Sequence, residues 1–92
     1  MGKYTPLEIF LVSADKTEIS LTFSRIESII GTSLPPSAYN YRPWWGNSHH
    51  TQAFAWLNAG FKVEHIDFAR QTVLFCKEVP AKSINTNAVT PG

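Results

Sequence analysis

The side chains with the most varied chemistry lie between Tyr41 and Gln52, in the middle of a 92-residue chain. This segment holds a guanidinium, adjacent indoles, adjacent imidazoles, and several amide and hydroxyl groups. Asn and Gln amides can form paired hydrogen bonds with adenine, and Arg can read guanine or hold a phosphate. An indole can stack on an unpaired or flipped base. The composition is that of a nucleic-acid contact surface, with candidate residues Tyr41, Arg42, Trp45, Asn47, Ser48, His49, His50 and Gln52.

The same residues also have a purely structural interpretation, and the sequence leaves both open. Trp44 and Trp45 can pack into the core, because large aromatic side chains gain most from burial. Asn47 or Ser48 can cap the helix that follows, and Arg42 can cover apolar surface. The Trp pair is therefore either core or contact surface.

The residues of the chain do not form a recognisable catalytic or metal-binding motif. His49, His50 and His65 suggest a metal site, but adjacent His side chains point in different directions and a structural zinc site needs four ligands at recognisable spacing. Cys76 is the single cysteine, and nothing in the sequence places a His beside it to make a nucleophile. The acidic residues are scattered singly, without the pairing that acid–base or two-metal chemistry uses. We expect no enzymatic activity, no metal and no cofactor.

Charge and composition limit the possible partners. A formal net charge of +1 is too low for strong non-specific nucleic-acid binding, so any such role depends on local patches. A single cysteine favours a reducing cytoplasm. The N-terminal segment lacks the apolar run of a signal peptide, and no segment approaches the ~20 apolar residues of a membrane span. We therefore expect a cytoplasmic protein that does not insert into membranes.

The first elements expected are a helix and a strand. Thr5 is a candidate N-cap, Pro6 suits the first helical position, and Glu8 completes a capping box. The polar residues after Ala14 mark the end of this helix. Residues 18–23 then alternate between polar and apolar side chains, which predicts a half-buried strand.

A second helix is expected to follow the strand directly. Thr22 or Ser24 can cap this helix, and Ser24 also begins a second capping box with Glu27. Gly31 provides the C-terminal cap.

A long aromatic connector, residues 32–49, leads to the third helix. The second and third helices lie about 19 positions apart, whereas helix–helix connections usually contain about 2–8 residues. Pro35 or Pro36 can begin a short helical turn that reaches Tyr41 and that Pro43 would stop. We expect the rest of the connector to be an ordered loop, because two adjacent Trp residues are rarely left in water.

A third helix from His50 to Ala59 and a terminal hairpin complete the expected elements. Gly60 ends the helix. The apolar residues change parity within the first hairpin strand, which predicts a β-bulge near Glu64 and His65. The expected strands are residues 61–68 and 72–77, joined by a turn at residues 69–71.

This order of elements is that of a winged helix-turn-helix, an α+β fold. In that fold the second and third helices form the helix-turn-helix, and the N-terminal residues of the third helix enter a major groove. The hairpin is the wing. We predict one such domain over residues 3–79, with the long connector as its unusual feature, and a flexible tail over residues 80–92. Arg25, Lys62 and Arg70 are candidate contacts to the phosphate backbone.

Four blocks of sequence carry a resemblance to a known family. They are LTFSRIESIIG (21–31), LPPSA (34–38), RPWWGN (42–47) and QAFAWLNAGFKV (52–63). With these blocks, residues 3–77 resemble a small prokaryotic family of unknown function, whose members occur alone or beside other modules, including nuclease-like ones. The chain departs from the family pattern at Pro43 and at Thr51, where Ser is usual. The resemblance implies one folded unit and, through the nuclease-like neighbours, an accessory role in reading DNA.

We therefore predict a non-catalytic nucleic-acid-binding module that reads DNA through the third helix and residues 42–52. The alternative is a protein-interaction adaptor or phage-type inhibitor that docks through exposed aromatic side chains. The sequence specifies neither the oligomeric state nor a target.

Overall fold

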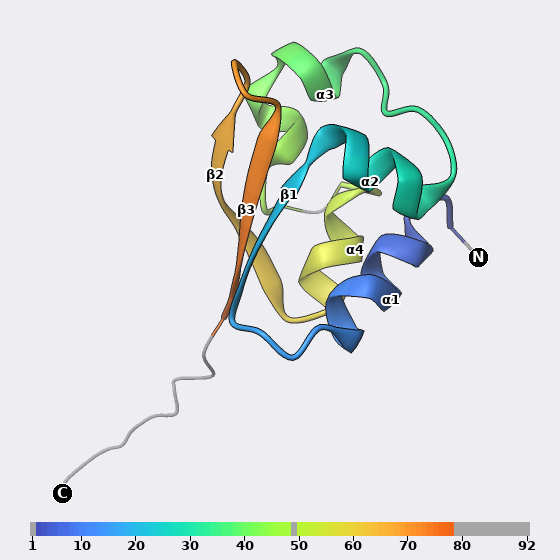
Figure 1. Ribbon diagram of the computed structural model, residues 1–92, viewed down its shortest axis with the longest axis vertical. Coiled ribbons are helices and arrows are strands. Elements are labelled where there is room, and N and C mark those ends of the chain that lie inside the picture. Colours follow the sequence, from blue (N-terminus) through green and yellow to red (C-terminus); the bar gives the residue numbers. More distant parts are fainter. Residues whose placement is uncertain (1, 49, 79–92) are drawn as a thin grey trace, which may run out of the picture.

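The computed structural model describes residues 2–48 and 50–78. His49, the predicted domain boundary at residue 79 and the predicted tail lie outside the described residues. The described residues form an α+β structure, as predicted, with four α-helices, one 3-10 helix and a three-stranded antiparallel sheet (Figure 1). The elements are α1 (Thr5–Ser13), β1 (Glu18–Thr22), α2 (Phe23–Ile30), α3 (Ser37–Asn40), η1 (Arg42–Trp45), α4 (Ala53–Asn58), β2 (Phe61–Asp67) and β3 (Thr72–Lys77).

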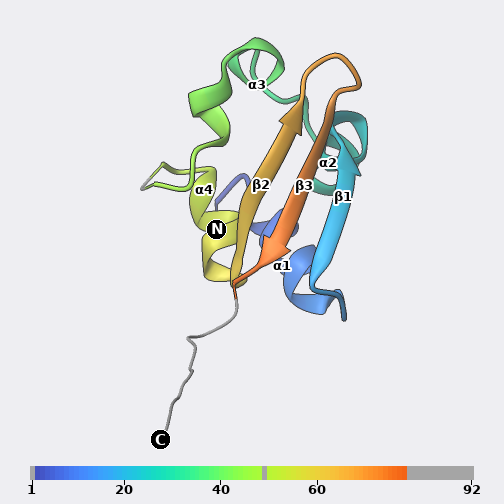
Figure 2. The ribbon, with the colours of Figure 1, turned by 90° about the vertical axis from the view of Figure 1, so that its left-hand side faces the viewer.

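The sheet has the order β1-β3-β2, so that the last strand lies in the centre. Helices α1, α2 and α4 cover one face of the sheet, and the opposite face is open in the described part of the chain (Figures 1 and 2). The register of β2 against β3 shifts between Val63 and His65, which confirms the predicted bulge. The extra residue, Glu64, restores the inward direction of the apolar side chains, and Ile66 is buried again.

The two predicted capping boxes are wrong, although the helices they mark are present. Thr5 lies inside α1, and its Oγ1 accepts a hydrogen bond from the main-chain N of Gly2 at 3.0 Å. Thr22 does cap α2, because its Oγ1 accepts from the main-chain N of Arg25 at 2.9 Å. The carboxylate of Glu27, which was expected to cap this helix, binds elsewhere.

Glu27 joins α2 to the connector. Its Oε2 accepts hydrogen bonds from the main-chain N of Leu34 at 2.9 Å and from the hydroxyl of Tyr39 at 2.5 Å. The bonds from Tyr39 and then from Leu34 hold the pKa of the Glu27 carboxyl below its ordinary value of 4.5, against the opposing effect of burial. The ionised carboxylate therefore stabilises the fold of the connector.

The connector contains more regular structure than the sequence indicated. The short helix expected after the two prolines is present as α3, with Pro36 as its N-cap. Helix α3 ends at Asn40 and Tyr41 is extended, close to the predicted end before Pro43. Pro43 itself lies near the start of η1, where its missing N–H is not needed. Helix α4 begins at Ala53, later than predicted, and neither Asn47 nor Ser48 caps it.

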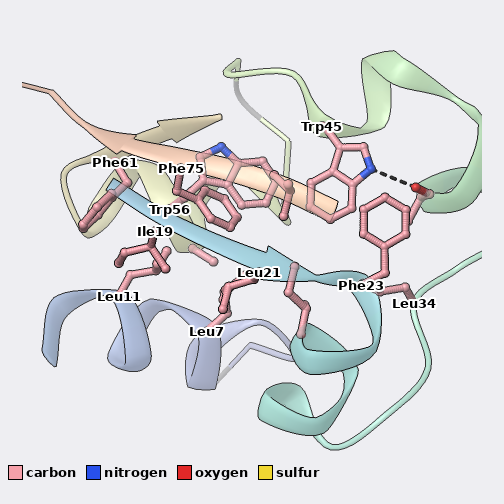
Figure 3. Packing of buried hydrophobic residues seen from close by; sticks show 14 of the residues in the cluster. Leu7, Leu11, Ile19, Leu21, Phe23, Leu34, Trp45, Trp56, Phe61 and Phe75 are labelled. Carbon is pink, nitrogen blue, oxygen red and sulfur yellow. Dashed lines mark hydrogen bonds between the residues drawn. The ribbon is translucent and has the colours of Figure 1, made fainter. Parts of the chain in front are cut away.

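The core is built around a row of aromatic rings (Figure 3). Trp45 of η1 lies between Phe23 and Trp56, with ring centroids 5.1 and 5.8 Å away and nearly parallel planes. Trp56 continues to Phe75 at 5.6 Å. The indole N–H of Trp45 donates to the main-chain oxygen of Ala38 at 2.8 Å, so its polar atom is satisfied inside the core. The connector thus supplies a central part of the core.

None of the helices among the described residues is long and apolar enough to cross a membrane.

Phe23→Ala should be strongly destabilising, because the ring is fully buried and contacts Trp45, Tyr39 and Phe68. We expect the free energy of unfolding, measured by urea denaturation, to fall by about 3–5 kcal/mol. Val12 is an exposed α1 side chain, so Val12→Ala should change it by less than about 0.5 kcal/mol. Equal effects of the two substitutions would contradict this description of the core.

Glu27→Gln should remove an acid-dependent part of the stability. Because folding lowers the pKa of Glu27, its contribution is present above pH 4.5 and is lost as the pH falls further. Near neutral pH the Glu27→Gln chain should therefore unfold at a lower urea concentration than the wild type, and the difference should shrink below pH 4.5. Glu8→Gln is the matched control. A difference that grows with acidity would disprove the assignment.

Candidate nucleic-acid interface

The predicted contact segment lies along the outer edge of β2. Figure 2 shows the connector and α4 beside this strand, on the side away from β1. A groove of about 360 Å³ separates η1 from β2, with Arg42 and Trp45 on one wall and Val63 and Ile66 on the other. The segment therefore covers the edge of the sheet.

Asn47 makes three hydrogen bonds, two to Val63 at the edge of β2 and one to Trp56 of α4. Its Oδ1 accepts from the main-chain N of Val63 at 2.8 Å and from the indole N–H of Trp56 at 3.1 Å. Its Nδ2 donates to the main-chain oxygen of Val63 at 3.0 Å. The amide thus pairs with one residue of β2 as a neighbouring strand would. The hydrogen-bonding groups that we expected to read adenine are already used inside the protein.

Two more predicted contact residues have structural roles. Gln52 is half-buried, and its Nε2 donates to the main-chain oxygen of Trp44 at 2.8 Å, which joins the start of α4 to η1. Trp45 is 2% exposed and cannot stack on a base without leaving the core. The prediction that Trp45 contacts nucleic acid is therefore wrong. Burial against Phe23 and Trp56 stabilises the indole more than an exposed position would.

The two arginines nearest the β2–β3 turn remain accessible. The Arg42 guanidinium stands 5.2 Å from the Phe68 ring centroid, and its Nη1 donates a long hydrogen bond of 3.5 Å to the main-chain oxygen of Ile66. Arg70 is in the turn itself, with a side chain that is 83% exposed and 3.8 Å from the Asp67 carboxylate. We call Arg42 and Arg70 the hairpin arginine pair, because Arg42 contacts Ile66 and Phe68 and Arg70 belongs to the turn that follows β2.

Other candidates lie apart from this pair. Lys62 is near the opposite end of β2, roughly 17 Å along the strand from Asp67, and it faces Cys76 in the register. The Arg25 guanidinium rests on the Phe10 ring of α1, with 5.6 Å to the ring centroid. The structure therefore does not bring all the predicted phosphate contacts together.

The small polar residues between η1 and α4 are exposed. Ser48 Oγ and His50 Nε2 are 3.5 Å apart, and the main-chain N of His50 donates to the oxygen of Ser48 at 2.8 Å. Tyr41, at the start of η1, is also exposed. These three side chains stay available for contacts, and His49 between them lies outside the described residues.

Sequence reasoning missed the outward face of α4. Phe54 and Asn58 of α4, with Thr51 just before the helix, are exposed and line a groove of about 240 Å³ against the start of α1, where Glu8 is the charged residue. Residues three and four apart lie on the same side of a helix, so the buried residues of α4 determine which of its residues are exposed. Ala53 and Trp56 are buried on the inner side of α4, and the exposed side could have been predicted from their spacing.

The described residues carry balanced charge. Of the eight Lys and Arg residues only Lys82 lies outside the described range, so seven cations accompany all seven Asp and Glu residues.

No three His, Cys, Asp or Glu side chains in the described ranges come together as a metal site. Burial, followed by the carboxylates of Glu18 and Glu64, raises the pKa of the Cys76 thiol against the opposing effect of Lys62. The Cys76 thiol is thus kept protonated, which suits a structural residue better than a nucleophile.

A family model described as "Domain of unknown function (DUF7662)" matches residues 4–78. The chain belongs to this family. The DUF7662 match runs from just before α1 to just after β3, so the connector and the hairpin both lie within the matched range. The expected membership of a small family of unknown function is confirmed. No curated protein and no solved structure matches the chain.

Asn47→Ala should lower the stability of this DUF7662 domain, because it leaves main-chain groups of Val63 and the indole of Trp56 without partners. We expect the free energy of unfolding to fall by about 1–3 kcal/mol. Asn40→Ala, an exposed Asn at the end of α3, is the matched control and should be neutral. Unchanged stability of the Asn47→Ala chain would show that the fold does not need this amide, and Asn47 would again be a candidate contact residue.

Proposed function

We propose that the chain is a non-catalytic nucleic-acid-binding module whose ligand is duplex DNA. The observation that carries this proposal is the hairpin arginine pair, because two guanidinium groups from distant parts of the sequence lie on one β-turn. Arg42 is oriented by the Phe68 ring, and Arg70 extends into solvent. Guanidinium groups held in this way suit phosphate oxygens, which they can bind through two parallel hydrogen bonds.

The element order supports a winged helix-turn-helix mode of binding. In this proposal α2 and α4 act as the helix-turn-helix and the β2–β3 hairpin acts as the wing. The sheet order β1-β3-β2 places the hairpin strands next to each other and leaves β2 beside α4 and the connector (Figure 2). In this proposal the ligand contacts both the turn and the exposed face of α4.

The competing interaction of Arg70 is weak. Its partner Asp67 is 3.8 Å away in an exposed pair, and such pairs contribute about 0–1 kcal/mol. Asp67 also accepts a hydrogen bond from the main-chain N of Arg70 at 3.0 Å, which shapes the turn without using the guanidinium. A phosphate oxygen could therefore replace the carboxylate while the turn keeps its form.

Base reading is assigned to the outward face of α4 rather than to Asn47 and Gln52. Asn58 can pair with adenine, and the side chains of Thr51 and Phe54 can contact a thymine methyl group. Glu8 lines the same groove and would repel a phosphate, which favours contact with base edges at this position.

A second candidate function is the docking of a protein. Its specific support is the set of exposed apolar side chains on α1 and α4, namely Ile9, Val12 and Phe54. A protein bound there would depend on apolar burial, and its affinity would respond little to salt. Salt dependence therefore separates the two candidates.

Arg42→Ala and Arg70→Ala should each weaken DNA binding and its salt dependence. With fluorescence anisotropy on a labelled duplex, each substitution should reduce the slope of log K against log salt concentration by about 0.9, one released counterion per phosphate contact. Lys16→Ala is the control, because Lys16 precedes β1 at the end of the sheet opposite the turn. Melting temperatures should stay unchanged in Arg70→Ala and Lys16→Ala and fall slightly in Arg42→Ala, which loses its contact with the Phe68 ring.

Two results would reject the proposal. The first is no binding of the wild type to duplex DNA even at low salt. The second is binding whose salt slope is the same in the wild type and in both arginine variants.

A further inference from the structure

The two edge strands of the sheet, β1 and β2, differ in how far their main-chain groups are covered. The edge of β2 is covered, because Asn47 occupies both main-chain groups of Val63 and Arg42 reaches the oxygen of Ile66. A bulge interrupts the same strand. Covered edges and bulges are common protection against unwanted strand pairing. The edge of β1 has neither device in the described part of the chain.

The hydrogen-bond pattern shows which groups of β1 point outward. The main-chain N of Lys77 donates to the oxygen of Thr17 at 2.7 Å, and that of Phe23 donates to the oxygen of Gln71 at 2.8 Å. Antiparallel strands alternate between bonded and non-bonded pairs, so odd-numbered residues of β1 bond to β3. The N–H and C=O of Ser20, at the centre of β1, therefore point away from the sheet.

We propose that β1 pairs antiparallel with β1 of a second copy of this chain, which joins two three-stranded sheets into one of six strands. The pairing is centred on Ser20, whose N–H donates to the C=O of Ser20 in the second copy and whose C=O accepts the reciprocal bond. Residues 18–22 contain neither Pro nor Lys, the residues that usually block such an edge.

Side-chain chemistry favours a second copy as the occupant. In the Ser20-centred register Glu18 faces Thr22 of the other copy, so the one charged side chain of β1 meets no like charge. On the helix-covered face Ile19 meets Leu21 of the other copy. Both keep 7% exposure, whereas Val73 and Phe75 in the central strand keep at most 1%. Pairing would cover this remaining apolar surface.

The inferred contact is independent of the proposed DNA contacts. β1 and β2 are the opposite edges of the sheet, so self-pairing leaves Arg42 and Arg70 uncovered. The mass measurement below uses no nucleic acid, and a failure of DNA binding would leave its result unaffected.

The test is the solution mass of the full chain, measured by analytical ultracentrifugation over a range of concentrations. The wild type should rise from its monomer mass of 10.3 kDa toward twice that value. Ser20→Pro should stay monomeric, because it removes an outward N–H that makes no bond to β3. Ser20→Ala, which keeps the N–H, is the matched control and should still dimerise.

Two further measurements keep the result interpretable if Ser20→Pro fails to fold. Ser20→Lys keeps the N–H but places two lysines opposite each other across the two-fold axis, so it should weaken the dimer most at low salt. The amide of Ser20 in the wild type should exchange with deuterium more slowly as the protein concentration rises, whereas those of Ile19 and Leu21 should not change. A wild type that stays monomeric up to about 1 mM, a concentration that would populate even a weak dimer, would overturn the proposal. This outcome includes the case in which a segment of another protein occupies this edge.

Discussion

The structure depends on the insertion of Trp45 between Phe23 and Trp56. This stack joins the start of α2, the 3-10 helix of the connector and α4 into one core. A connector of this length would otherwise cost conformational entropy without contributing to the core. The buried indole must also satisfy its N–H, and the main-chain oxygen of Ala38 does so, which in turn fixes α3. One side chain thus explains why an unusually long segment between two helices is ordered.

The position of the connector determines which polar groups face solvent. Once Trp45 is buried, Asn47 reaches Val63 and its amide completes the edge of β2. Arg42, at the start of η1, stays exposed with its guanidinium over the Phe68 ring. Asn47 and Arg42 both have side chains suited to nucleic-acid contacts, but Asn47 is used inside the protein and Arg42 faces solvent. Capacity for hydrogen bonding is a poor guide to function where a sheet edge competes for the same groups.

Features that depend on near neighbours could be predicted from the sequence. The change of apolar parity before Ile66 located the bulge, and the α+β class followed from the order of helices and strands. Features that depend on distant partners could not. Glu27 has the spacing of a capping box, but it binds Tyr39, 12 residues away. Asn47 resembles a helix cap, but it binds Val63, 16 residues away. A local pattern states what a side chain can bind, and tertiary packing decides which partner wins.

Balanced charge places a physical limit on the proposed DNA contact. With seven cations and seven anions in the described residues, a single copy would gain binding free energy from only a few released counterions. The face of α4 that we propose reads bases is also short, with six residues in the helix. Two copies joined through β1 would present two such faces on one ligand, and the second contact would form at the high effective concentration set by the first. Pairing through the open edge of β1 would thus compensate for the modest charge of each domain. The two proposals are tested separately, but both follow from the small number of contacts that one copy can make.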